Sequence, residues 1–297
     1  MTQWVVGRPA PPLRPLIDAY IGYRSAGLRA GPNDTAGLRA GPNDTAGLHR
    51  GLPSRHLTVI VSIGGPIDVV AQTDPRQPPA SYRFVISGLQ ARSALIASPS
   101  SQEGVAVELT PLGSRALLGL PARALWDTSV EAADVVGAPA TELWERLHHV
   151  GDWAGRFAAC DDVLLRLLAG ARAGPVAAQV AGAWDVLVAS GGTVGVAELA
   201  DRVGWSRRHL AHRFAAEFGL SPKLAGRVVR FERATRLLRS PRRPPISDVA
   251  AVCGYYDQPH LNRDFVELAG CPPGEWLQTE LPSVQDDQLA EPAGSTS

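Results

Sequence analysis

The spacing of hydrophobic residues changes along the chain, and its first clear pattern is that of strands. Between residues 56 and 110, short runs rich in valine and isoleucine alternate with clusters of Gly, Pro, Ser and Asp. This alternation is typical of strands joined by turns. The runs are HLTVIVSIGG, IDVVAQ, YRFVISGLQ, SALIAS and VAVELT. Their spacing of about 10–12 residues predicts a small antiparallel sheet or barrel.

From residue 112 to residue 190 the hydrophobic positions follow a helical spacing. Leu143, Leu147 and Val150 fit one helical stripe, and Leu164 and Leu168 fit another. Both stripes suit core packing or a dimer interface, and core packing is the simpler interpretation. A further helix is expected in AAQVAGAWDVLVAS, before the Gly-rich linker SGGTVG at 190–195. We therefore expect an N-terminal domain over residues 1–190.

A pair of short helices is predicted directly after this linker. VAELADRV, residues 196–203, carries one apolar stripe and is followed by Gly204, which suits a helix end. Ser206 is a good N-cap for a second helix that buries Leu210, Phe214 and Phe218. Two short helices with a tight turn between them predict a helix-turn-helix unit.

The same pattern returns fifty residues later. ISDVAAVC, residues 246–253, repeats the first stripe, and Gly254 and Tyr255 stand where Gly204 and Trp205 stood. With one extra turn residue, Leu261 and Phe265 repeat the buried positions of the second helix. The intervening SPKLAGRVVRFERATRLLRS predicts one long helix that begins at Pro222. The repetition strengthens an assignment that one unit alone would leave weak.

The charged residues indicate a partner only when they are counted segment by segment. The 297 residues carry 29 Lys+Arg and 29 Asp+Glu, and this zero balance alone would exclude a polybasic nucleic-acid binder. Residues 1–190 are balanced, with 16 Arg against 16 Asp+Glu. Residues 202–243, however, hold twelve cations and only two carboxylates. Such a local excess, beside the helix-turn-helix pair, is the pattern expected for contacts with phosphates.

Residues 193–277 resemble the tandem helix-turn-helix domain of the AraC/XylS family of bacterial transcription regulators. The resemblance rests on VAELADRVGWSRRHLAHRFAAEFGLSP, RFERATRLL and ISDVAAVCGYYDQPHLNRDFVELAGCPP. It departs from the family at Ala225, where the connecting helix usually has an aromatic residue. Residues 10–168 are, more loosely, similar to the family's β-rich sensor domains. The expected fold is α+β, with a β-rich sensor domain before an all-α DNA-binding domain at 191–281.

The resemblance implies that the second helix of each pair enters a major groove, in two successive grooves about 34 Å apart. With the apolar positions buried, the predicted DNA-contacting residues of the first unit are Ser206, Arg207, Arg208, Ala211 and His212. Those of the second unit are Gln258, Pro259, His260, Asn262 and Arg263. Arginine suits guanine or phosphate, and Gln258 and Asn262 suit adenine. Asp257 is expected to cap a helix rather than to read a base.

Other function classes have less support in the sequence. No G-x-S-x-G, H-E-x-x-H or phosphate-loop motif occurs, and His56 stands apart from other ligands, so we expect neither an enzyme nor a metal site nor a cofactor. One alternative is a DNA-repair alkyl acceptor fused to such a domain, but Cys160 lies in a predicted helix. A barrel-type metabolite-binding enzyme is another. We expect DNA as the partner, and a small effector, RNA polymerase and a second copy as further candidates.

Three further expectations concern the chain's surroundings and its ends. No apolar run approaches the length of a membrane span, and no signal peptide is evident, so a cytoplasmic protein is expected. AGLRAGPNDT occurs at 26–35 and again at 36–45, and its turn-forming residues predict a duplicated surface loop. The polar segment 282–297 is predicted to be a disordered tail.

Overall fold

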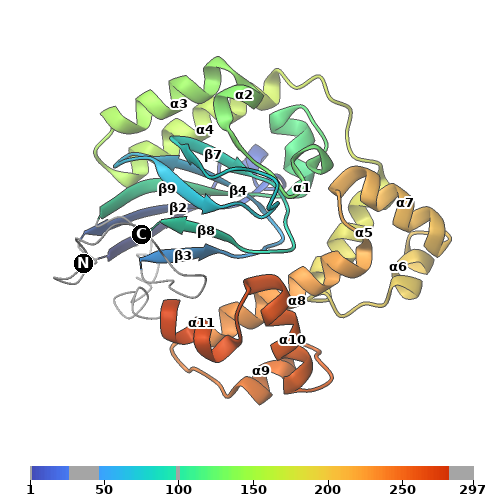
Figure 1. Ribbon diagram of the computed structural model, residues 1–297. Helices are drawn as coiled ribbons and strands as arrows, with labels where there is room; N and C mark the ends of the chain where they lie inside the picture. Colours follow the sequence, from blue (N-terminus) through green and yellow to red (C-terminus); the bar gives the residue numbers. More distant parts are fainter. Residues whose placement is uncertain (1, 27–46, 98–100, 281–297) are drawn as a thin grey trace, which may run out of the picture.

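The computed structural model describes residues 2–26, 47–97 and 101–280 of the chain. A β-rich N-terminal region with flanking helices is followed by an all-helical C-terminal region, as the sequence predicted (Figure 1). The helices α5 to α7 lie at one side of the strands in Figure 1, and α8 to α11 lie below β3 and β8. Apart from Ala26, the predicted duplicated loop lies outside the described ranges, and so does the predicted tail.

The N-terminal region contains two antiparallel sheets. The larger sheet has the strand order β1-β2-β9-β4-β7-β10. Its strands are β1 (Thr2–Gly7), β2 (Ile17–Ala26), β9 (Ser101–Leu109), β4 (Leu57–Ser62), β7 (Phe84–Ser87) and β10 (Ser129–Glu131). The smaller sheet has the order β3-β8-β5-β6. Its strands are β3 (Leu48–Gly51), β8 (Ala94–Ala97), β5 (Ile67–Ala71) and β6 (Ala80–Tyr82).

The alternation of buried positions explains how the larger sheet is covered. In β4, Leu57, Val59 and Val61 are buried in the main core, whereas Ile60 packs against a separate cluster in the smaller sheet. The sheet is therefore apolar on both faces. All five predicted β runs form strands, and β1, β2, β3, β6 and β10 are strands that the sequence analysis did not predict.

Helices cover the face of the larger sheet that carries Val59. They are α2 (Ala132–Val136), α3 (Ala138–His149) and α4 (Trp153–Ala169), preceded by the short turns η1 (Pro11–Leu13), α1 (Pro111–Gly113), η2 (Ser114–Leu118) and η3 (Ala122–Leu125). Leu143 and Leu147 are buried between α3 and the sheet, and Leu164 and Leu168 pack against the same core. Of the two interpretations of these leucines, core packing is confirmed.

The C-terminal region repeats its helices at the offset seen in the sequence. The first unit is α6 (Val196–Arg202) with α7 (Arg207–Phe218), and the second is α9 (Ile246–Val252) with α10 (Gln258–Ala269). Between them, α8 (Pro222–Arg239) has 18 residues, which is about 27 Å of helix. The terminal helix α11 (Pro273–Glu280) places Trp276 in the core of the second unit.

The helix α5 (Ala178–Ala189) contacts α6, α7 and α8. Its Trp184 ring lies 4.8 Å from the Phe218 ring and 5.9 Å from the Phe214 ring, both in α7. The boundary at residues 190 and 191 stays a prediction. The packing of α5 against α6, α7 and α8 shows that this helix of the predicted N-terminal domain lies with the helices that follow it.

Candidate nucleic-acid interface

The two helix-turn-helix units share the same turn geometry. Gly204 and Gly254 have φ values of +71° and +76°, a left-handed conformation that favours glycine. The side chain of Ser206 accepts a hydrogen bond from the amide of His209 at 3.2 Å, and Asp257 accepts one from the amide of His260 at 2.7 Å. Both predicted N-caps are confirmed.

An aromatic residue and a histidine also recur at matching positions. The rings of Trp205 and His209 meet edge-to-face with centroids 4.5 Å apart, and those of Tyr255 and His260 do so at 5.2 Å. Each pair packs an aromatic residue of the turn, one residue before the N-cap in the first unit and two before it in the second, against the first turn of the second helix. The two predicted recognition helices, α7 and α10, therefore begin in a similar way, with one extra residue in the second turn.

On α7, the predicted DNA-contacting side chains lie on one accessible side. Ser206, Arg207, Arg208 and His212 are exposed, whereas Ala211 is half-buried. The two arginines have no ion pair with any described residue, so their charges are available to a ligand. Sequence reasoning passed over Arg213, which is exposed beside His212.

On α10, the predicted DNA-contacting residues differ more in how exposed their side chains are. Gln258, Pro259 and Arg263 are exposed, whereas His260 and Asn262 are half-buried. The sequence analysis also passed over Tyr256, which is 93% exposed in the turn just before α10. Only the structure distinguishes this exposed tyrosine from its buried neighbour Tyr255.

Several arginines of α8 are bound to other groups of the protein, although the charge count of residues 202–243 indicated contacts with phosphates. Arg227 bonds to Asp264 of α10, Arg236 pairs with Glu232, and Arg239 lies over the ring of Trp276. Arg230 donates to the backbone oxygen of Gly192 at 2.9 Å. These four arginines are therefore held by groups of the protein itself, and Arg227 and Arg239 join α8 to α10 and α11. The cations of α7 and α10 that have no ion pair with described residues are Arg207, Arg208, Arg213 and Arg263, and Lys223 at the start of α8 has none either.

Residues 199–279 match the family model described as a helix-turn-helix domain. The helical region is an AraC-type helix-turn-helix domain. A domain of this type makes the chain a DNA-binding transcription regulator. No curated protein matches the sequence.

Solved structures that resemble the chain include ToxT from Vibrio cholerae. An apo variant of ToxT from strain SCE256 gives a TM-score of 0.50 at 12% identity, over 78% of this chain and 93% of that one. ToxT from strain O395 gives 0.48 at 13% identity, over 88% of this chain and 96% of that one. The DNA-binding domain of AdpA, solved in complex with a target DNA, gives a TM-score of 0.35 at 21% identity. The match covers 37% of this chain and 100% of that one. The likeness to the SCE256 variant concerns the fold alone.

The AraC-type domain is fastened to the β-rich region at separate points. Near the end of α7, Arg115 makes two hydrogen bonds to Glu217, and Trp126 lies against Gly219. At the end of α10, the Ser93 hydroxyl donates to the Ala269 carbonyl at 2.9 Å. Both recognition helices are thus held through their C-terminal ends, away from the residues predicted to meet DNA.

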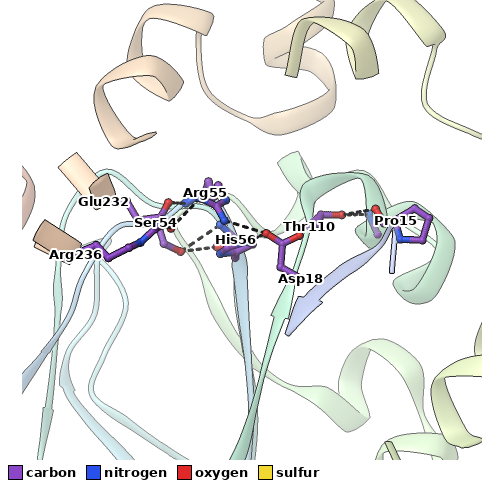
Figure 2. Close-up of polar contacts among 9 residues, drawn as sticks. Pro15, Asp18, Ser54, Arg55, His56, Thr110, Glu232 and Arg236 are labelled. Carbon is purple, nitrogen blue, oxygen red and sulfur yellow. Dashed lines mark hydrogen bonds and ion pairs between the residues drawn. The ribbon is translucent and has the colours of Figure 1, made fainter. Parts of the chain in front are cut away.

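A third attachment holds α8 through a chain of charged groups. Figure 2 shows Arg55 between Glu232 of α8 on one side and Asp18 on the other. The Arg55 amide donates to Glu232 at 3.0 Å, and its guanidinium approaches Asp18 at 3.0 Å. His56 lies 2.7 Å from the same Asp18 oxygen and is buried, so its ring is held by this carboxylate.

The same contacts set the ionisation of Asp18. The hydrogen bond with His56 is the largest cause, and Arg55 adds to it, while partial burial opposes both. Together they lower the pKa of Asp18 to about 2. The carboxylate is therefore charged throughout the neutral range and keeps its attraction for Arg55.

The cysteines and the possible metal ligands give little support to an alkyl-accepting protein or a metal site. Burial raises the pKa of the Cys160 thiol to about 12, and Cys253 and Cys271 are buried as well. A nucleophilic thiol is usually accessible and has a lowered pKa. Within residues 2–26, 47–97 and 101–280, no group of His, Cys, Asp and Glu side chains is arranged to hold a metal ion. Across the same ranges, no helix is long and apolar enough to cross a membrane.

Proposed function

We propose that the chain regulates transcription by placing α7 and α10 in two successive major grooves on one side of a duplex. The observation that carries the proposal is the matched geometry of the two units. Their turns, N-caps and aromatic–histidine pairs repeat, and a single helix of about 27 Å joins them. Successive grooves are about 34 Å apart, a distance that two linked units of this size can span.

Within this proposal the ten predicted contact residues bind different groups of the DNA. Arg208 suits guanine, Arg263 suits guanine or phosphate, Gln258 and Asn262 suit adenine, and Ala211 offers only an apolar contact. Selection of bound fragments from genomic DNA tests the proposal. It should recover a shared sequence whose affinity falls steeply with salt, because bound phosphates release counterions. Recovery of fragments without any shared sequence would refute sequence-specific regulation.

We further propose that the β-rich region modulates this binding through its attachments to the AraC-type domain. The support is that Arg115 holds α7, Arg55 holds α8 and Ser93 holds α10. A change in the sheet that moved these side chains would change how α7 and α10 are presented. Arg55→Ala should therefore alter the affinity for the selected sequence while all DNA-facing residues are intact. An unchanged affinity would contradict this route.

An effector of the β-rich region would meet an apolar environment in a cavity beside the larger sheet. A cavity of about 40 Å³ lies between the larger sheet and the helices α3 and α4. Its lining includes Val59, Phe84, Leu143 and Leu164, and every lining residue is apolar. A space of this size holds no metabolite without movement of a helix, so binding here would be coupled to the position of α3 or α4.

No enzymatic step is part of the proposal, and it includes no cofactor. Homodimer formation and contact with RNA polymerase stay predictions from the sequence.

A further inference from the structure

A hollow of about 460 Å³ lies between α8 and α10, and its lining is rich in charge. Lys223, Arg227 and Arg230 of α8 follow one another at intervals of four and three residues, so they share one helix face. From α10 the lining residues are His260, Arg263, Asp264 and Glu267. Four cations and two carboxylates leave the lining with an excess of two positive charges.

Both carboxylates of the hollow are already occupied. Arg227 donates from two nitrogens to one Asp264 oxygen, at 2.7 and 3.1 Å, and also bonds to Glu267. Asp264 is only 4% exposed, so this pair forms a fixed wall that joins α8 to α10. The positive charge that the wall does not neutralise belongs to the other three cations.

Those three cations differ in how they are held. Arg230 is fixed by the Gly192 carbonyl and lies 5.6 Å from the centre of the Tyr255 ring, with its buried Nε unpartnered. Lys223 and Arg263 are exposed, and neither bonds to another described residue. The hollow is therefore lined by two exposed cations without a bond to described residues, one on each helix, and by a third that is held by the Gly192 carbonyl.

The hollow opens away from the β-rich region and toward the predicted DNA side. Glu232, which binds Arg55 of the β-rich region, follows Arg230 by two residues, about half a turn around the helix. On α10, Arg263 belongs both to the hollow and to the predicted DNA-contacting residues, directly beside Asn262. A duplex bound along α10 would therefore pass the opening.

We propose that this hollow binds a backbone phosphate of the DNA segment beside the groove occupied by α10. Lys223 from α8 and Arg263 from α10 bind the phosphate oxygens, and Arg230 adds positive potential behind them. The proposal rests on the proposed function, and it assigns Arg263 to phosphate rather than to guanine. It also gives α8 a direct part in DNA binding, besides that of a spacer.

The test compares the full-length chain with Lys223→Gln, Lys223→Arg and Arg263→Gln, using the selected duplex from 50 to 200 mM salt. Arg8→Gln is the matched control, because Arg8 is an exposed arginine of the β-rich region without a bond to described residues. Each variant is also measured on duplexes that carry single base-pair changes. Lys223 is exposed, so its removal should leave the fold intact, which a thermal unfolding curve verifies.

We expect Lys223→Gln and Arg263→Gln each to reduce the salt slope by about one and to weaken all duplexes equally. Lys223→Arg and Arg8→Gln should keep the wild-type slope. A wild-type slope in Lys223→Gln, or a loss confined to one base pair in Arg263→Gln, would overturn the phosphate site and leave the regulator intact. Absence of salt-dependent binding in the wild-type chain would instead overturn the proposed function itself.

Discussion

Arg115 and Glu217 join the β-rich region to the end of the first recognition helix through two parallel hydrogen bonds, of 2.7 and 2.8 Å. The Glu217 side chain is only 9% exposed, whereas that of Arg115 is 30% exposed. Two residues further on, a Cβ at Gly219 would lie 2.6 Å from Trp126. The ion pair and this close approach fix one end of α7 against the β-rich region.

The ion pair between Arg115 and Glu217 should contribute to the free energy of unfolding. Arg115→Ala leaves Glu217 buried without a counter-charge, and we expect the free energy of unfolding to fall by about 3 kcal/mol. Arg202→Ala is the control, because both side chains of the Arg202–Glu198 pair are more than half exposed, and its loss should cost less than about 1 kcal/mol. Urea titration measures both. Equal losses in the two variants would contradict a special role for Arg115.

Arg208 should contribute to sequence readout. Arg208→Ala is expected to lower the affinity for the selected duplex by about 1–3 kcal/mol and to relax the preference at one base position. Competition binding with single base-pair variants measures both effects. Arg242→Ala, which removes an exposed arginine beyond the end of α8, serves as the control. An Arg208→Ala protein with the wild-type preference at every position would contradict the assignment.

Asp18 should make the stability of the protein sensitive to acid. Its pKa is about 2 in the folded chain against an ordinary value of 3.8, so its stabilising contribution is present above pH 4. This contribution is lost as pH falls from about 4 toward 2. The free energy of unfolding should therefore decline more steeply there in the wild type than in Asp18→Asn.

The matched control for this pH dependence is Asp134→Asn, which changes an exposed carboxylate in the first turn of α2. It should keep the wild-type steepness between pH 4 and pH 2. If Asp18→Asn follows the wild-type curve as well, the contact with His56 and Arg55 contributes nothing to the pH dependence.

The cysteines should be inert in the folded chain. Cys160, Cys253 and Cys271 are all buried, and burial raises the pKa of Cys160 to about 12. A thiol-reactive disulfide reagent at pH 8 should modify them only after unfolding, because the reaction requires an accessible thiolate. Rapid modification of one thiol in the native protein would reopen the alternative of an alkyl-accepting protein.

The helix-turn-helix pair could be predicted because its determinants are local. Gly204, Ser206 and Leu210 lie within one short segment, and each acts on its neighbours through a turn, a cap or a buried stripe. Gly254, Asp257 and Leu261 repeat the pattern. The β1 and β2 strands have no comparable signal, since they come before the regular alternation that begins near residue 56.

The attachments between the two regions could not be predicted because their partners are distant in sequence. Arg55 and Glu232 are 177 residues apart, and Arg115 and Glu217 are 102 residues apart. For the same reason the sequence does not show how many arginines of α8 are bound to other residues of the protein. The count of arginines gives no sign that Arg227 is paired with a buried aspartate 37 residues away.

Hydroxyl-radical footprinting of the full-length chain on its selected duplex tests the central claim most directly. Two recognition helices in successive major grooves predict two protected segments on one side of the duplex, with centres about 10–10.5 base pairs apart. Arg208→Ala should weaken protection of one segment, and Gln258→Ala should weaken protection of the other. A single protected segment, weakened alike by both substitutions, would contradict the account.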